Sequence, residues 1–320
     1  MNDSKYRKIE KNQQGLHDKF LHLVTTELDW YEREALALLG KKRLPALQDN
    51  QIIQQMLAKS PNDENKKLSD PAYYTANVVA YLKVCKDILQ PNFIKQFDVS
   101  SGGVLDDLII YNYHRLFRAL LFDSLVLLNE YAYRIKERVE PPYGCGKNLS
   151  QHHMTMYQSL KQSIFGQASF HSFTEIQPDL AVSIIRQIVE LRVRRAFGVL
   201  GWYQPQTQSV EPLPISKLFE EIKKHESDID LSVPLECLMR IYGWSNIFLH
   251  TGIKDYIWKP IVVKQYLKEF CLGKQGQYNV NGGVVVTKSV LAAIVRSLEQ
   301  AHPAGAQIII INPEAVVKDA

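Results

Sequence analysis

The chain has 320 residues, of which 46% are hydrophobic and 22% charged, with a formal net charge of +4. This is ordinary globular composition, with enough length for two domains or for one domain with an appendage. The mild basic excess permits contact with a polyanion, but it is not the dense basic footprint of a dedicated nucleic-acid binder. No apolar run approaches the roughly 20 residues needed to cross a bilayer, which excludes a membrane-spanning protein.

The cysteine pattern indicates a reducing compartment. The four cysteines lie far apart without a C-x-x-C pair, and no signal-peptide pattern is present, so we expect a cytoplasmic protein. Cys145, His152 and His153 lack a fourth ligand at structural-site spacing, so no metal is predicted. Residues 282–289 end in Lys-Ser like a phosphate-binding loop but carry Val-Val-Val-Thr where glycines are needed, so no cofactor is predicted.

The N-terminal part reads as helices separated by loops. Apolar residues at helical intervals predict a long helix over residues 12–39, and a shorter helix follows at 50–58. The polar stretch 59–71 predicts a surface loop. Asp70-Pro71 then predicts a helix start, because a first turn needs a side-chain acceptor before it and tolerates proline inside it.

Further helices are predicted over residues 105–139, 151–165, 178–200, 215–225 and 232–251. Residues 204–214, "QPQTQSVEPLP", read as a linker-like loop. Only the last fifty residues change character: β-branched runs around Asn281-Gly282 predict a hairpin, a helix follows at 288–301, and "AQIIIIN" reads as a buried strand.

The predicted fold is therefore mostly α, in three parts. Residues 1–100 form an N-terminal helical region, residues 101–272 a helical bundle, and residues 273–320 a small ββαβ C-terminal appendage.

The helix predicted over 232–251 contains the most informative stretch, "RIYGWSNIFLHTG". Leu238, Ile241, Ser245, Phe248 and Leu249 share the stripe predicted to face the core. Tyr242, Asn246 and His250 are each four residues apart, so they form a second row along the flank of the same helix. Gly243 costs about 1 kcal/mol relative to alanine in mid-helix, and we expect another helix to pass close to it.

"SNIFLHTG", following a helix of the type "SIIRQIVELRVRRAFG", is similar to the HEPN superfamily of helical bundles, many of which are ribonucleases of toxin and antiviral-defence systems. The family motif has an arginine, a polar residue, three variable residues and a histidine near the end of a late bundle helix. Here His250 matches the histidine and Asn246 the polar residue, while Ser245 stands where the arginine belongs. The resemblance implies a HEPN-like bundle, RNA as partner, and a homodimer with His250 near the two-fold axis.

The serine departs from the family pattern at a point where the chemistry needs a cation. Metal-independent RNA cleavage through the 2′-hydroxyl requires charge stabilisation on the phosphate, which a guanidinium provides as a fixed bidentate fork. Arg240 is ten residues from His250, roughly 15 Å along the axis, and does not reach easily. An arginine from the other basic helix could substitute. The candidate catalytic residues are thus His250, Asn246 and Ser245, and the candidate RNA- or phosphate-binding residues are Arg186, Arg192, Arg194, Arg195 and Arg240.

Two interpretations remain open at this stage. One is an RNA-associated HEPN-like protein, either a metal-independent endoribonuclease or a degenerate relative. The other is a non-catalytic helical scaffold whose ββαβ segment offers an exposed sheet edge to a protein partner. Both features also have a purely structural interpretation. The arginine-rich helix could be a solvated charged face whose opposite side buries Ile184, Ile188, Leu191 and Phe197. His250 could be a favourable charge at a helix C-terminus.

Overall fold

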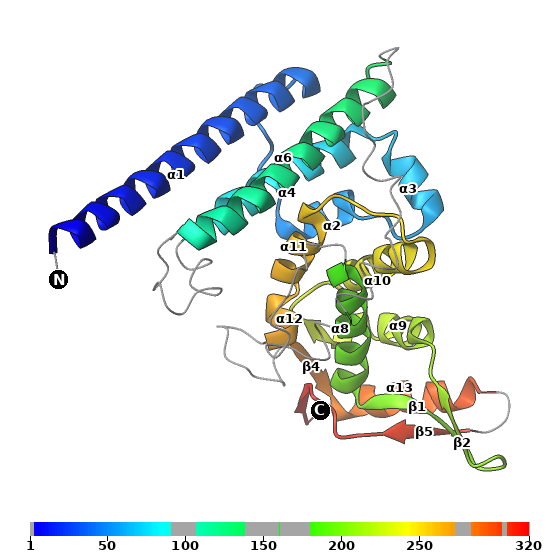
Figure 1. Cartoon of the computed structure of the whole chain (residues 1–320). Coiled ribbons are helices and arrows are strands. Elements are labelled where there is room, and N and C mark those ends of the chain that lie inside the picture. The colour runs from blue at the N-terminus through cyan, green and yellow to red at the C-terminus, as the bar shows by residue number, and fades with distance from the viewer. Residues whose placement is uncertain are drawn as a thin grey trace. The chain divides into compact units, whose positions relative to one another are not determined.

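The computed structural model describes residues 3–90, 107–137, 160, 180–272, 283–302 and 306–319. The protein is mostly helical with small sheets in its C-terminal half, which confirms the predicted mostly α class (Figure 1). Within those ranges no helix has the length and apolarity to cross a membrane. The chain divides into two compact units, the first made of residues 1–56, 62–180 and 251–262, the second of residues 57–61, 181–250 and 263–320.

The first unit is helical. The long helices α1 and α6 lie side by side, and α4 packs against both of them and against α2 (Figure 1). Along α1 the buried side chains recur every three or four residues, as expected for one apolar stripe on a helix. The elements of this unit are α1 (Asp3–Leu39), α2 (Asp49–Met56), α3 (Pro61–Lys67), α4 (Pro71–Ile88), α6 (Asp107–Arg134) and the beginning of α11 (Trp258–Tyr266).

Local chemistry sets the boundaries of these helices. Gly40 follows α1 with a φ of +66°, a backbone conformation that glycine adopts without cost. The Asp70 carboxylate accepts from the Ala72 backbone N–H at 2.8 Å, with Pro71 in the first turn, so the predicted helix start is confirmed. The predicted loop 59–71 instead contains the short helix α3, whose first turn is acidic and last turn basic, which favours a helix on dipole grounds.

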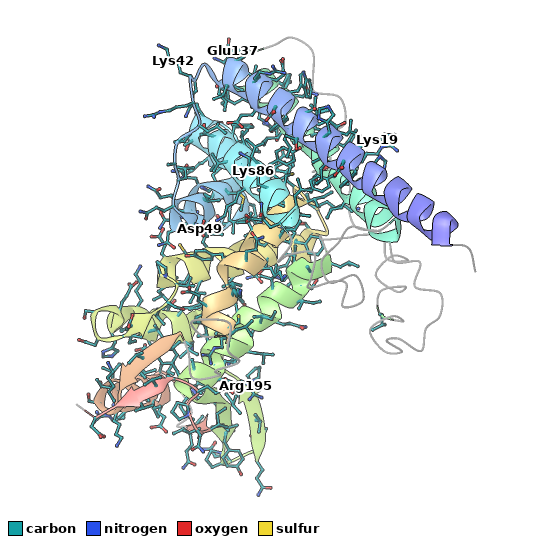
Figure 2. The ribbon with its side chains drawn as sticks, turned by 90° about the vertical axis from the view of Figure 1, so that its left-hand side faces the viewer. Lys19, Lys42, Asp49, Lys86, Glu137 and Arg195 are labelled. Carbon is teal, nitrogen blue, oxygen red and sulfur yellow. The ribbon has the colours of Figure 1, made fainter. Side chains whose placement is uncertain are left out.

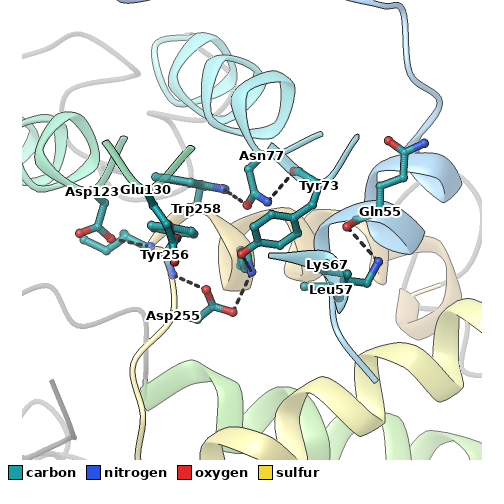
Figure 3. Close-up of polar contacts among 12 residues, drawn as sticks. Gln55, Leu57, Lys67, Tyr73, Asn77, Asp123, Glu130, Asp255, Tyr256 and Trp258 are labelled. Carbon is teal, nitrogen blue, oxygen red and sulfur yellow. Dashed lines mark hydrogen bonds and ion pairs between the residues drawn. The ribbon is translucent and has the colours of Figure 1, made fainter. Parts of the chain in front are cut away.

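The interior of the first unit is aromatic and carries a polar cluster (Figure 3). Trp258 is fully buried and donates from Nε1 to Asn77 Oδ1 at 3.1 Å, and its ring stacks on Tyr256. The Tyr256 hydroxyl donates to Glu130 Oε2 at 2.6 Å. Lys259, only 1% exposed, bonds Asp255 Oδ2 at 2.8 Å. These contacts fix the segment 255–259 in the first unit.

Two ion pairs lie on the surface of this unit, near the labelled Asp49 and Lys86 (Figure 2). Lys83 pairs with Asp49 at 2.5 Å and Lys86 with Glu32 at 4.0 Å. Solvated pairs of this kind contribute only tenths of a kcal/mol to about 1 kcal/mol. The stability of this unit therefore rests mainly on its buried aliphatic and aromatic side chains.

The second unit combines helices with two three-stranded sheets, of strand order β2-β1-β5 and β3-β4-β6. Within the first sheet β1 pairs antiparallel with both neighbours, and in the second β4 pairs antiparallel with β3 and parallel with β6. The elements of this unit are α8 (Leu180–Phe197), β1 (Val199–Gln204), β2 (Ser209–Pro212), α9 (Ile215–Lys224), η3 (Glu226–Asp228), β3 (Asp230–Leu231), α10 (Leu235–Thr251), the end of α11, α12 (Lys268–Leu272), β4 (Val284–Thr287), α13 (Lys288–Gln300), β5 (Gln307–Ile310) and β6 (Val316–Lys318).

The hairpin β1–β2 replaces a predicted helix end and a predicted loop. Gly198, with a φ of +69°, ends α8 after Phe197, whereas we expected the helix to reach Leu200. A Cβ at Gly198 would lie 2.5 Å from the Ile311 carbonyl oxygen, so the strand after α8 needs a glycine at this close approach. The residues beyond it are β-prone and pair with Ser209–Pro212.

The C-terminal segment is not a separate appendage. Its described strands are β4, β5 and β6, and two of them pair with strands from earlier in the chain, β5 with β1 and β4 with β3. The predicted hairpin around Asn281-Gly282 and the predicted helix 151–165, apart from residue 160, lie outside the described residues. The two units divide the chain differently from the three predicted segments. Strands β5 and β4 pair with β1 and β3 from earlier in the chain, and residues 251–262, which include the buried Tyr256, Trp258 and Lys259, belong to the first unit.

Candidate functional site

The helix α10 has the orientation predicted for its core face. Leu238, Ile241 and Phe248 are buried, while Leu249, at the edge of the predicted stripe, is 39% exposed. The helix ends at Thr251, where Gly252 has a φ of +65°, as predicted. The helix begins at Leu235, three residues later than predicted, with Pro234 O accepting from Cys237 N–H.

Another segment of backbone passes close to Gly243, as predicted, but this segment is not a helix. A Cβ at this position would collide with the backbone carbonyl oxygen of Lys59, which lies in the non-helical segment before α3. Arg240, one turn earlier on α10, donates from Nη1 to the Leu57 carbonyl oxygen at 3.1 Å. The segment 57–61 is therefore held directly against α10.

Arg186 of α8 joins the polar row of α10. Its Nε donates to Asn246 Oδ1 at 2.7 Å and its Nη2 donates to the Tyr242 hydroxyl at 3.0 Å. The guanidinium carbon lies 5.1 Å from the centroid of the Tyr242 ring. The Arg186 side chain is 30% exposed, so the cation is oriented by these contacts and still reaches solvent. An arginine from the other basic helix thus bonds the asparagine of the motif.

His250 is exposed and lies one helical turn beyond Asn246. Residues four apart on a helix are neighbours, with Cβ atoms about 5–6 Å apart. The imidazole is therefore on the row that Arg186 contacts and on the solvent side of the helix. It is not packed in the apolar interior.

Ser245 does not belong to this surface. It has no exposed area, and its hydroxyl donates to the Tyr242 carbonyl oxygen at 2.8 Å within the same helix. A fully buried hydroxyl that bonds its own helix has no access to a phosphate. The predicted catalytic set therefore reduces to Asn246 and His250, joined by Arg186.

The remaining predicted phosphate-binding arginines mostly serve the fold. Arg192, 8% exposed, donates to the Phe270 carbonyl oxygen and pairs with Glu314 at 3.1 Å, and burial lowers its pKa despite that carboxylate. Arg194, also 8% exposed, donates to the carbonyl oxygens of Leu200 and Leu213. Neither guanidinium presents its donors to solvent, so neither is part of the candidate site.

Arg195 and Arg240 differ in their access to solvent. The Arg195 side chain is 56% exposed on the surface of the second unit and pairs with Glu314 at 3.1 Å (Figure 2). The Arg240 side chain is only 11% exposed, and besides Leu57 it contacts Glu236 at 3.5 Å. Of the predicted phosphate-binding arginines besides Arg186, Arg195 alone is exposed enough to add a second cationic contact.

The apolar side of α8 is not the predicted one. Ile184, Ile188 and Leu191 are 57%, 39% and 55% exposed, and only Phe197 of the four predicted core residues is buried. The helix carries a second apolar stripe, and that stripe faces the core: Val182, Ile185, Val189, Val193 and Ala196. A sequence with two apolar stripes does not reveal which of them is buried.

Two further residues complete the site and were not selected from the sequence. Tyr242 was recognised in the row of α10 but given no role, although it both bonds and stacks with Arg186. Glu190 lies between two arginines, 2.9 Å from Arg194 Nη2 and 3.7 Å from Arg186 Nη1. The sequence signal for Glu190 was its position four residues from both Arg186 and Arg194, a spacing that favours ion pairs on a helix.

The cluster has the groups needed to bind and polarise a phosphodiester. Arg186 offers a permanent charge with a planar fork of donors, and Asn246 and Tyr242 fix its orientation. The exposed His250 imidazole one turn away offers ring nitrogens that can donate or accept a hydrogen bond. Among the described residues no three His, Cys, Asp or Glu side chains gather as metal ligands, and Cys145, His152 and His153 lie outside them.

Comparison with known proteins identified no relative of this chain. No protein-family model, no curated protein and no solved structure matches the chain.

Proposed function

We propose that the protein is a HEPN-like, RNA-directed protein of the toxin or antiviral-defence type, acting as a metal-independent endoribonuclease. The observation that supports this most is the bond from Arg186 Nε to Asn246 Oδ1 at 2.7 Å. It supplies, from α8, the guanidinium that the motif lacks at Ser245.

In this proposal the residues of the cluster divide the work. Arg186 binds the scissile phosphate and stabilises its developing negative charge, while Asn246 and Tyr242 hold the guanidinium in place. His250 moves the proton of the 2′-hydroxyl or of the leaving oxygen. Both steps use the RNA's own hydroxyl as nucleophile, so the proposal includes no metal and no cofactor.

The resemblance also leads us to include a homodimer and a cytoplasmic setting. Two copies of α10 would bring two His250 side chains to one RNA strand. None of the three described cysteines, Cys85, Cys237 and Cys271, forms a disulfide, which suits a reducing compartment.

The test is cleavage of single-stranded RNA by the purified full chain and by His250→Ala. Wild type should cleave and bind, and the variant should bind with unchanged affinity and not cleave, because His250 is exposed and its removal leaves the core intact. Unchanged cleavage by the variant would reject this site. Absence of both binding and cleavage in wild type would reject the RNA-directed function.

A non-catalytic scaffold is the second candidate, and one observation favours it. The strand β5 is at the edge of its sheet, and its Ile310 side chain is 59% exposed. Exposed edges accept a partner strand through main-chain bonds. Ile310→Lys should then abolish partner binding while leaving any RNA cleavage unchanged.

A further inference from the structure

The helix α6 exposes one face that is both aromatic and basic. His114, Arg118 and Phe122 follow one another at intervals of four residues, and two turns later Asn129 and Tyr133 continue the row, so the five side chains share one side of the helix. All five are exposed, Phe122 by 60% and Tyr133 by 43%. This row is called the basic–aromatic face below.

The opposite side of α6 is the one that packs in the first unit. It contacts α1 and α4 (Figure 1), and the ring centroids of Tyr131 and Tyr74 of α4 are 5.1 Å apart. The buried side chains on this side recur every three or four residues: Phe117, Leu120, Ser124, Leu127 and Tyr131. The rings of Phe122 and Tyr133 are thus left open to solvent, although phenylalanine is usually buried.

Among the described side chains of α6, no carboxylate lies on the basic–aromatic face. The two acidic residues after the first turn belong to other sides of the helix: Asp123 accepts from the Ile257 backbone N–H at 3.0 Å, and Glu130 is only 4% exposed. Arg118 is exposed on the face, and Lys136 is exposed just beyond the end of the helix. The charge of this face is therefore positive, which is complementary to a polyanion.

Exposed aromatic rings beside cations match the chemistry of single-stranded nucleic acid. Its unpaired bases stack on aromatic side chains, and its phosphates pair with arginine and lysine. Phe122 and Tyr133 are eleven residues apart, about 16 Å along the helix axis, so they stack on different bases of one strand. A helix that lies on a membrane buries one continuous apolar face, whereas here the two rings alternate with polar side chains.

We propose that the basic–aromatic face of α6 binds single-stranded nucleic acid, with bases stacked on Phe122 and Tyr133 and a phosphate on Arg118. The face shares no residue with the Arg186 cluster of the second unit. It therefore stands independently of the RNA cleavage proposed above.

The experiment measures binding of a fluorescent single-stranded DNA to the full chain in EDTA. A DNA strand has no 2′-hydroxyl, so it stays intact whether or not the protein cleaves RNA. Phe122→Leu should weaken binding about tenfold, because leucine keeps an apolar side chain without a π-face, and Phe122→Trp should bind at least as tightly as wild type. The same strand in a duplex should bind more weakly and equally to all three proteins, because its bases are already stacked.

The cationic part of the face is tested by salt dependence. Arg118→Gln should reduce the slope of log affinity against log salt concentration by about 0.7, the value for one phosphate of a single strand. Lys42→Gln removes the same charge from an exposed position of the first unit and should leave the slope unchanged.

Two results would overturn the proposal. One is a Phe122→Leu variant that binds the strand as tightly as wild type, which excludes base stacking. The other is a loss, in the Phe122 variants, of binding to vesicles of phosphatidylserine and phosphatidylcholine alone, which makes the face a lipid surface. Because Phe122 is largely exposed, its variants should unfold at the same denaturant concentration as wild type, and Tyr133→Leu replaces Phe122→Leu if they do not.

Discussion

Arg186 and Asn246 are 60 positions apart in the chain, and Nε of the first lies 2.7 Å from Oδ1 of the second. The bond uses only one edge of the guanidinium. A second donor of the guanidinium, Nη2, bonds the Tyr242 hydroxyl at 3.0 Å. The fork is therefore aimed by two residues of α10, and its Nη1 faces the Glu190 carboxylate at 3.7 Å, with which a phosphate would compete.

Arg186→Lys tests whether the fork matters beyond its charge. Lysine keeps the positive charge but offers a single ammonium that cannot bond Asn246 and Tyr242 and still present a fork. We expect RNA affinity to fall about tenfold, with Arg186→Ala also reducing the salt-dependence slope by about 1. Binding measured across salt concentrations gives both numbers. Arg296→Lys, an exposed arginine on α13, is the matched control and should leave affinity unchanged. Equal losses at the two positions would contradict the assignment.

Glu190 restrains Arg186, and removing its charge should strengthen RNA binding. Its carboxylate lies 3.7 Å from Arg186 Nη1 and competes with a phosphate for that cation. Glu190→Gln should raise affinity about threefold, since partly exposed pairs are worth only tenths of a kcal/mol to about 1 kcal/mol. Glu226→Gln removes the same charge from an exposed position of the same unit. If both variants gain affinity alike, the effect is one of net charge and the local restraint is rejected.

Many helix boundaries could be predicted from the sequence, but it could not show which helix face is buried or which distant strands pair. Caps and terminators such as Asp70 and Gly252 act within a few residues, so they were readable. The choice between the two apolar stripes of α8 depends on which neighbours pack there, and Ile184 and Leu191 were assigned to the wrong side. The hairpin β1–β2 was missed because its strands are short and turn-rich, and its pairing with β5 is set more than a hundred residues away.

The site shows the same division between local and distant information. The row of Tyr242, Asn246 and His250 follows from helical spacing alone. Ser245 was included because of the motif, although its position on the core stripe already indicated burial. That an arginine of the other basic helix could reach the motif was foreseen, but selecting Arg186 over Arg192 or Arg194 required the contacts themselves.

The buried pair Lys259–Asp255 should be important for the first unit. Lys259→Met leaves Asp255 without its cation, and breaking a buried ion pair by removing one partner costs about 3 kcal/mol. Chemical denaturation of the full chain measures the loss, and Lys264→Met, an exposed lysine on the same helix, should change stability by less than about 0.5 kcal/mol. A loss below that bound for Lys259→Met would show that the pair does not stabilise the fold.

Glu221 should make the stability of the second unit depend on pH. Burial alone would raise the pKa of this carboxyl, but hydrogen bonds from Lys224 and Ser297 outweigh burial and hold the pKa below its ordinary value of 4.5. Because the folded pKa is lowered, the stabilisation is present above the unfolded pKa and is lost as pH falls through the folded pKa.

The free energy of unfolding of wild type relative to Glu221→Gln should therefore decrease as pH is lowered from about 6 to about 3. Glu220→Gln, at the exposed neighbouring position, supplies the control. A difference that stays constant over this range would contradict the lowered pKa.

The most direct measurement is cleavage of a single-stranded RNA and of a DNA of the same sequence, in EDTA, by wild type, His250→Ala and Arg186→Ala. Wild type should cleave the RNA and spare the DNA, because the 2′-hydroxyl is the nucleophile, and each variant should lose cleavage. RNA cleavage that requires a divalent metal, or that survives in both variants, would contradict it.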